Sequence, residues 1–443
     1  MIDSKVISKE KADDEIHPSL KLEVISKTSD FDSLKEEWNT LAEQTGVHIF
    51  QAFEWQRTWW EVFGGNNKLH ILLFRYRHEL IGIMPFFLDS FRVFGSPVYR
   101  CLRLLGSRVI QPESGAIPVE LAFSDYLSAI IHPDYKREVL TCLQEYLQSN
   151  SDFYDEIILE EIPQEDVLID KFLPEMKQRG WKSKTKEASV CPQVHFPEEW
   201  DELLSDLSSN ARYQIRRDIR RVTEDGIFEL HTAESLEELK QVFQELVYFH
   251  QQRWHNLGQP GIFADKRITE FFEKVTMRLY KQGQVISKTL SAEGQNVAID
   301  LYYKYNNRIY MIQRGFDDTS TFNQYGPGNV LLYCFLKEAI EEGIEVYDFL
   351  RGDEKYKLRT ANHVQQNLEV ILQKKTDLQE RRSKVNNMVH NYARAKRKLY
   401  NEKQIMKVHM EKNNPVFALG IYMKEFFQRG IRKLNSSTKV PKP

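Results

Sequence analysis

Apolar side chains recur at helical or strand spacings along most of the first 175 or so residues. Phe31, Leu34, Trp38 and Leu41 follow one another every three or four residues, which predicts a helix over 30–44. A second apolar stripe ends in two glycines, as helices commonly do. The pattern therefore predicts, in order, a second helix at 53–65, strands at 68–76, 79–88 and 124–133, a helix at 137–150 and a strand at 155–163.

A similar order appears again further along the chain. The second set is a helix at 234–254, three strands within 284–317 with turns at 292–295 and 305–308, a helix at 329–343 and a strand at 344–350. The order of helix, antiparallel strands, helix and strand thus occurs twice, which predicts a duplicated unit. The pattern is broken at 180–197, where we expect the boundary.

These patterns predict the fold class and the domains. We expect an α/β (α+β) protein whose two domains each hold a mixed, mostly antiparallel sheet flanked by helices. The predicted parts are a flexible leader at 1–20, a first domain at 21–190, a second domain at 191–375 and a basic helical tail at 376–443.

The charge is distributed unevenly. The whole chain has a formal net charge of −3, but residues 374–443 contain 18 Lys and Arg against 5 Asp and Glu. A basic tail of this kind favours peripheral contact with an anionic membrane. The first 19 residues lack the apolar core of a signal peptide, and no run of eighteen apolar residues occurs, so we expect a cytoplasmic protein, peripheral to the inner face of the membrane at most. The four cysteines have no metal-ligand spacing, and we predict no metal.

The segment 326–359 carries the strongest candidate chemistry. It opens with Gly-Pro-Gly at the predicted start of a helix, where backbone amides without partners attract phosphate. A plain tight turn with Pro327 at the helix start explains the same residues. No Gly-Lys-Ser/Thr follows, and the preceding strands read as antiparallel hairpins, so neither a P-loop nor a dinucleotide-binding fold is predicted.

Two charged segments each allow a functional interpretation and a purely structural one. Arginines recur on one face of a predicted helix after Ser208, where they either bind an anionic acceptor or form a solvated surface. Mixed charges follow the strand predicted at 344–350, where they either line an acceptor site or form ion pairs with one another. The flanking sequence lacks the aromatic pattern of nucleic-acid binding, which makes nucleic acid an unlikely partner.

The motifs of the second half resemble a known superfamily. "LSSNARYQIRRDIRRV", "YFHQQRWHNLGQPGIF", "DLYYKYNNRIYMIQRGFD" and "YGPGNVLLYCFLKEAIEEGIEVYDFLRGDEKYKLR" look like the GNAT acyltransferases. They most resemble the CelD/BcsL-like acetyltransferase branch associated with bacterial cellulose and exopolysaccharide synthesis. The resemblance covers about 22–375 and extends to the Fem-type aminoacyltransferases, which are tandem GNAT proteins. It implies two GNAT-like domains, of which the second carries the donor site.

The resemblance also implies the site. Acetyl-CoA, as co-substrate, would lie along a central strand and the following loop, with these contacts: Gln313, Arg314, Gln324, Tyr325, Gly326, Gly328 and Asn329. The loop is a shortened, proline-containing version of the family's, which leaves another acyl donor open. A base is needed to deprotonate the attacking group, and His250 and Asp300 are the candidates. The candidate acceptor-binding residues are Arg212, Arg216, Arg253, Asp348, Arg351, Asp353 and Lys355.

The expected function is direct transfer of an acyl group, acetyl above all, from acyl-CoA to an amine or hydroxyl of a sugar or cell-envelope precursor. One alternative is a Fem-like aminoacyltransferase, for which charged tRNA would be the partner. Another is a non-catalytic binding protein of this fold in polysaccharide assembly.

Overall fold

The computed structural model describes residues 20–93, 96–108 and 124–374, the helical residues 402–411, and the positions 388, 391, 395 and 399. The predicted leader, apart from Leu20, and most of the predicted basic tail lie outside this part of the chain, and so does the basis of the proposed membrane contact. In the described part, no helix has the length and hydrophobicity needed to cross a bilayer.

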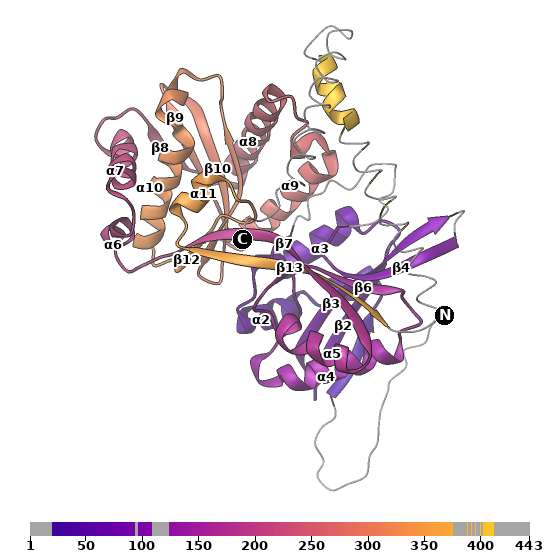
Figure 1. Ribbon diagram of the computed structural model, residues 1–443. Coiled ribbons are helices and arrows are strands. Elements are labelled where there is room, and N and C mark those ends of the chain that lie inside the picture. The colour runs from indigo at the N-terminus through magenta and orange to yellow at the C-terminus, as the bar shows by residue number, and fades with distance from the viewer. Residues whose placement is uncertain are drawn as a thin grey trace, which may run out of the picture.

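The first half contains most of the predicted elements (Figure 1). Its elements are β1 Leu20–Ile25, α1 Thr28–Asp32, α2 Lys35–Thr45, η1 Ile49–Gln51, α3 Phe53–Phe63, β2 Lys68–Tyr76, β3 Glu79–Val93, β4 Ser96–Leu104, β5 Ile130–Ile131, η3 Pro133–Tyr135, α4 Lys136–Ser149, β6 Glu156–Pro163, η4 Leu168–Phe172, α5 Leu173–Gln178 and β7 Trp181–His195. The single helix predicted at 30–44 is interrupted at Ser33. The strand predicted at 124–133 is reduced to β5, because Tyr126 has a left-handed φ of 54° that a strand excludes.

The second half repeats the order. It contains α6 Trp200–Ser205, α7 Ser209–Thr223, β8 Glu229–Thr232, α8 Leu236–Asn256, η5 Ile262–Ala264, α9 Lys266–Tyr280, β9 Val285–Ala292, β10 Gln295–Tyr305, β11 Arg308–Phe316, η6 Thr321–Tyr325, α10 Pro327–Glu341, β12 Val346–Asp348, α11 Lys355–Thr360 and β13 His363–Lys374. The predicted mixed α/β architecture is confirmed. Both turns predicted between its strands are tight, with left-handed residues at Glu293–Gly294 and Asn306–Asn307.

All described strands belong to one continuous sheet. Its order is β1-β2-β3-β4-β6-β13-β7-β12-β11-β10-β9-β8, with β5 beside β3. Most neighbours are antiparallel, and each half has a single parallel pair, β4 with β6 and β11 with β12. The topology thus repeats as the sequence pattern indicated.

Two long strands join the halves. The segment predicted as a broken boundary, 180–197, forms β7, which pairs with β13 over residues 181–193 and with β12 at its C-terminal end. β13 in turn pairs with β6 of the first half, although it follows the second half in sequence. In Figure 1, this pair crosses from the orange half into the purple half. The sequence did not predict the strand β7, because its middle residues are exposed and lack an apolar alternation.

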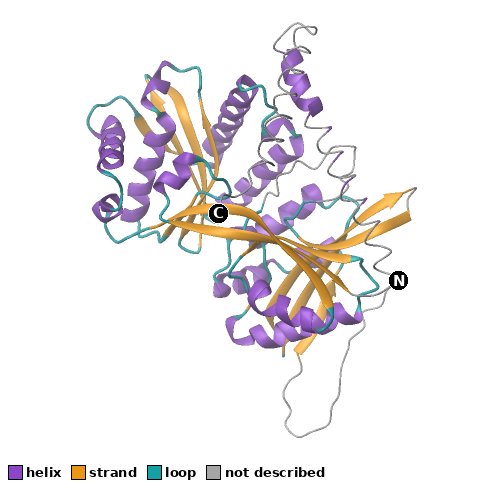
Figure 2. Ribbon diagram, viewed as in Figure 1, coloured by secondary structure: helices purple, strands orange, loops and turns teal. Residues whose placement is uncertain are grey.

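Helices cover both faces of the sheet (Figure 2). In the second half, α6, α7 and α10 lie on one face and α8 and α9 on the other. The largest core joins both halves, with α3 packed against α9 around the buried Trp55, Trp59, Phe271 and Tyr303. A core shared in this way holds the two halves in one fixed relation.

Candidate active site

The two parallel strands of the second half part from each other after a short stretch of pairing. β11 and β12 pair only at Arg308 with Val346, Ile309 with Tyr347 and Tyr310 with Asp348. Beyond Tyr310, the edge of β11 that faces β12 has no strand partner among the described residues. Its next backbone groups therefore face open space.

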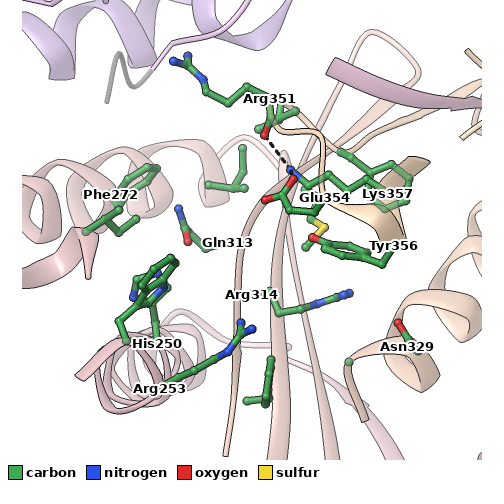
Figure 3. A pocket seen from close by; sticks show the side chains of 18 of the residues that line it. His250, Arg253, Phe272, Gln313, Arg314, Asn329, Arg351, Glu354, Tyr356 and Lys357 are labelled. Atoms are coloured by element: carbon green, nitrogen blue, oxygen red, sulfur yellow. Dashed lines mark hydrogen bonds and ion pairs between the residues drawn. The ribbon is translucent and has the colours of Figure 1, made fainter. Parts of the chain in front are cut away.

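A β-bulge lies at the point where the strands part. Leu301 of β10 pairs with Gln313, whereas its neighbour Tyr302 pairs with Met311, so Ile312 is an extra residue on β11. An extra residue reverses the alternation of the strand and bends it. The bulge places Arg314 opposite Asp300. As successive strand residues, Gln313 and Arg314 point to opposite sides of β11, Gln313 toward α8 and Arg314 toward α10 (Figure 3).

A pocket of about 630 Å³ opens at this parting. In the second half, its walls come from α8, β11, the start of α10 and the segment after β12. The first half contributes Phe50, Trp55 of α3 and Asp125. Its polar lining residues are Asp125, His250, Arg253, Gln313, Arg314, Asn323, Asn329, Arg351, Glu354 and Lys357. A concave site with a few convergent polar groups is the usual form of a ligand site.

The start of α10 forms one wall of the pocket. Gly326 caps the helix with a left-handed φ of 67°, which glycine adopts at no steric cost. Pro327 has no N–H, and the amides of Asn329 and Val330 donate to the Gly326 carbonyl. Within the described chain, this leaves the Gly328 amide as the helix-start donor without an acceptor. The loop before it is held by Arg221 of α7, which donates to the Tyr325 carbonyl and stacks over the Tyr325 ring.

Arg314 lies beside this open amide. A Cβ placed on Gly328 would lie 3.7 Å from Nη1 of Arg314. The other side of the guanidinium is fixed by Asp300, since Nε donates to Oδ1 at 2.6 Å and Nη2 to Oδ2 at 2.5 Å. Tyr302 donates a further hydrogen bond to Asp300, which is fully buried. One guanidinium edge, one amide and the positive end of the helix dipole therefore converge on a single spot, which suits an anionic group.

The opposite side of β11 is lined mostly by aromatic groups. His250 lies here at 8% exposure, 5.0 Å from the Phe263 ring, and burial lowers its pKa to about 4. Its imidazole is therefore neutral near pH 7. Gln313 points into the same space between His250 and Phe272 (Figure 3). Arg253 stacks over the Phe316 ring at 4.5 Å.

A buried polar cluster closes the pocket between the two halves. Arg351 pairs with Asp125 at 2.8 Å and lies 3.5 Å from Glu161, and both carboxylates belong to the first half. Tyr126, Glu161 and Leu350 all have left-handed φ angles here, whereas the other non-glycine residues with positive φ among those described lie in hairpin turns. Backbone strain of this kind costs about 1–3 kcal/mol per residue and is typical of functional sites.

Asp348 lies directly behind this cluster. Tyr126, Gln193 and the Leu350 amide each donate to its carboxyl group, at 2.7 to 2.8 Å. It is fully buried, and burial raises the pKa of Asp348 to about 7. It therefore holds the strand end and the pocket wall together, and it does not line the pocket itself.

The corresponding parting in the first half is flanked by ion pairs. β4 and β6 pair over only three residues, as β11 and β12 do. Arg103, the last residue of β4 that pairs with β6, forms ion pairs with Asp89 and Glu160. Arg108, further along the chain, forms ion pairs with Glu160 and Glu369. Ion pairs thus lie beside the paired stretch of β4 and β6 in the described first half.

Comparison with known families identifies this part of the fold. Residues 209–358 match the model of the acetyltransferase (GNAT) domain. The match runs from α7 to α11 and includes β11, β12 and the start of α10. The pocket is therefore largely formed by the GNAT domain, with a smaller contribution from the first half.

Solved structures are similar to this chain at low sequence identity. FemX is 13% identical with a TM-score of 0.53, and the match covers 76% of this chain and 95% of FemX. L-PGS from Bacillus licheniformis is 10% identical (TM-score 0.45; 81% and 97% covered), and a tandem GNAT protein from the clavulanic acid biosynthesis pathway is 11% identical (TM-score 0.41; 81% and 100% covered). A comparison with curated proteins gave no significant match.

The structure brings many of the predicted site residues together. Those that line the pocket are His250, Arg253, Gln313, Arg314, Gly326, Gly328, Asn329 and Arg351. Asp300 and Asp348 lie behind its wall, and Tyr325 is held by Arg221. Gln324, Asp353 and Lys355 are exposed and outside the lining, as is Arg216, which pairs with Asp201, while Arg212 donates to the Ser205 carbonyl.

Sequence reasoning missed the contribution of the first half. Phe50, Trp55 and Asp125 lie about 200 or more residues before the strand that they face, and no local pattern marks them as site residues. Glu354, Tyr356 and Lys357 also line the pocket, and they lie within the charged segment after β12 that the sequence did single out. No three His, Cys, Asp or Glu side chains in the described chain are placed to hold a metal ion.

Proposed function

We propose that the protein is an acyltransferase that moves an acyl group, acetyl in the simplest case, from acyl-CoA to an acceptor in this pocket. The observation that carries the proposal is the parting of β11 and β12 next to the free Gly328 amide, within a matched GNAT domain. A thioester held along β11 would place its carbonyl among the backbone groups that have no strand partner. Following the sequence resemblance, we propose a sugar or cell-envelope precursor as the acceptor.

The donor would bind on the α10 side of β11. There, the Gly328 amide, Nη1 of Arg314 and the side chain of Asn329 face a common space. A phosphate group fits these donors, since charged hydrogen bonds and the helix dipole act together on it. In this proposal, Asp300 positions Arg314 instead of acting as a base, because both of its oxygens accept hydrogen bonds from the guanidinium.

Chemistry would take place where the two sides of the pocket meet. A backbone amide near Gln313 would polarise the thioester carbonyl. Of the two candidate bases, His250 and Asp300, only His250 lines the pocket, and its imidazole is neutral, so we propose that it receives the proton of the attacking group. No covalent intermediate on the protein is required.

The test is calorimetric titration with acetyl-CoA. We expect binding by the unchanged protein and none by Gly328→Trp, whose indole would fill the space beside Arg314. Glu341→Trp, on the exposed end of the same helix, is the matched control and should bind normally. Normal binding by Gly328→Trp would remove the proposed donor site.

A Fem-type aminoacyltransferase is the second candidate. The observation that favours it is the small number of open amides at the start of α10, together with the fold shared with FemX. A donor other than CoA would need fewer pyrophosphate contacts there. Incubation with acetyl-CoA and, separately, with aminoacyl-tRNA distinguishes the two, by CoA release in one case and by loss of the aminoacyl group in the other.

A further inference from the structure

The charges that line the pocket are mostly paired with one another. Of the two lining carboxylates, Asp125 is engaged by Arg351 and Glu354 by Lys357, the latter at 3.1 Å. Arg314 is engaged by Asp300 from behind. Arg253 differs, because its contact in the described structure is the Phe316 ring and no acidic partner lies within ion-pair distance.

This arrangement matters for an amine acceptor. A primary amine with an ordinary pKa is protonated near pH 7, so it enters the pocket as an ammonium ion. A buried ammonium needs a carboxylate partner, because an unpaired buried charge is costly. Both lining carboxylates already have cationic partners, and Arg253 would repel a further cation.

The acceptor side of β11 instead offers uncharged hydrogen-bonding groups beside aromatic rings. The side-chain amide of Gln313 has no hydrogen-bond partner among the described residues, and it points into the space next to neutral His250 (Figure 3). The Trp254 ring is 37% exposed at the same wall. Amide, imidazole and an indole surface together suit a polyhydroxylated ring, whose hydroxyl groups need hydrogen bonds and whose C–H faces need apolar contact.

We infer that the acceptor is an uncharged sugar hydroxyl, bound between Gln313, His250 and Trp254, and that the product is an ester. This inference rests on the proposed acyltransferase function and selects between its two acceptor classes. In the reaction, the hydroxyl oxygen forms a bond to the thioester carbonyl carbon and the carbon–sulfur bond breaks. The hydroxyl proton passes to the imidazole of His250 and then to the departing thiolate, which leaves as CoA thiol.

The experiment compares glucose with glucosamine, which share a scaffold and differ by one amino group. Binding of each sugar to the acetyl-CoA-loaded protein is measured by saturation-transfer NMR. We expect glucose to bind and protonated glucosamine to bind severalfold more weakly, because Arg253 is exposed and solvent screens its repulsion of the ammonium. Equal or tighter binding of glucosamine would overturn the inference, and so would binding of neither sugar.

A charge reversal tests the electrostatic reason separately. Arg253→Glu should reduce or invert the preference for glucose, because the variant offers an unpaired carboxylate to the ammonium. Arg179→Glu, at an exposed position in the first half, is the control and should leave the preference unchanged. An unchanged preference in Arg253→Glu would also count against the inference.

The product gives a third readout. Alkaline hydroxylamine cleaves oxygen esters and leaves amides intact under mild conditions, so an acetylated sugar that loses its acetyl group supports the inference. An amide product would overturn it while supporting the proposed acyltransferase function. Absence of acetyl-CoA binding would instead refute the proposed function, and the inference with it.

Discussion

The pairing of Arg314 with Asp300 should have two separable effects, one on stability and one on donor binding. Asp300 is fully buried and the Arg314 side chain is 12% exposed. Arg314→Gln would leave a buried carboxylate without its counter-charge, which costs about 3–5 kcal/mol of unfolding free energy. The double variant Asp300→Asn with Arg314→Gln removes both charges and should recover most of that loss, because neutral replacements of similar size for a buried pair are often nearly neutral in stability.

Donor binding should follow a different pattern in the same variants. A hydrogen bond from a charged donor is worth about 1.5–3 kcal/mol, so loss of Nη1 of Arg314 should weaken acetyl-CoA binding roughly tenfold to a hundredfold. The double variant should remain weak, even though its stability is recovered. Stability is measured by urea unfolding and affinity by calorimetric titration.

Arg103→Gln in the first half provides the matched control. Arg103 is also a buried arginine that holds carboxylates at a strand parting, but it lies outside the pocket. This variant should lose comparable stability and keep its acetyl-CoA affinity. If the double variant at 300 and 314 binds acetyl-CoA as tightly as the unchanged protein, Arg314 is not a donor contact and the reasoning fails.

Further predictions concern single positions. Gly328→Ala should raise stability by about 0.5–1 kcal/mol, because alanine favours a helix and its Cβ meets Arg314 only at van der Waals distance; a loss of stability in thermal unfolding would contradict this. Asp348 has a folded pKa above its unfolded one, so its stabilising contribution is complete below about pH 4 and is lost as the pH rises through about 7. The stability of Asp348→Asn relative to the unchanged protein should therefore rise by about 2–3 kcal/mol from about pH 5 to about pH 8. Urea unfolding at the two pH values measures this, and an equal difference at both would contradict it. His250→Gln should lower kcat for acyl transfer by about a hundredfold with little change in acetyl-CoA affinity; unchanged kcat would exclude His250 as the proton acceptor.

The local sequence was sufficient for most elements and for one wall of the site. The stripe at 329–343 and the strand at 344–350 are set by apolar spacing over a few turns, and α10 and β12 formed there. Gly326 and Gly328 were singled out because a Gly-Pro-Gly turn at a helix start is visible locally and matches the resemblance to GNAT proteins. The repeated order of elements was equally visible, and the duplicated topology confirmed it.

The remaining features depend on which strands meet, and strand pairing is not encoded in any short segment. β7 resembled a broken linker because its partners, β12 and β13, satisfy its backbone and it needs little apolar alternation of its own. Asp125, Phe50 and Trp55 reached the pocket only because the halves share one core. Asp300 was predicted as a catalytic base from its apolar neighbours, but the bulge at Ile312 turned Arg314 onto it, and that pairing places it behind the wall. The sequence thus determined most of the elements and the glycine-rich start of α10, whereas long-range pairing alone decided which side chains face the open space between the strands.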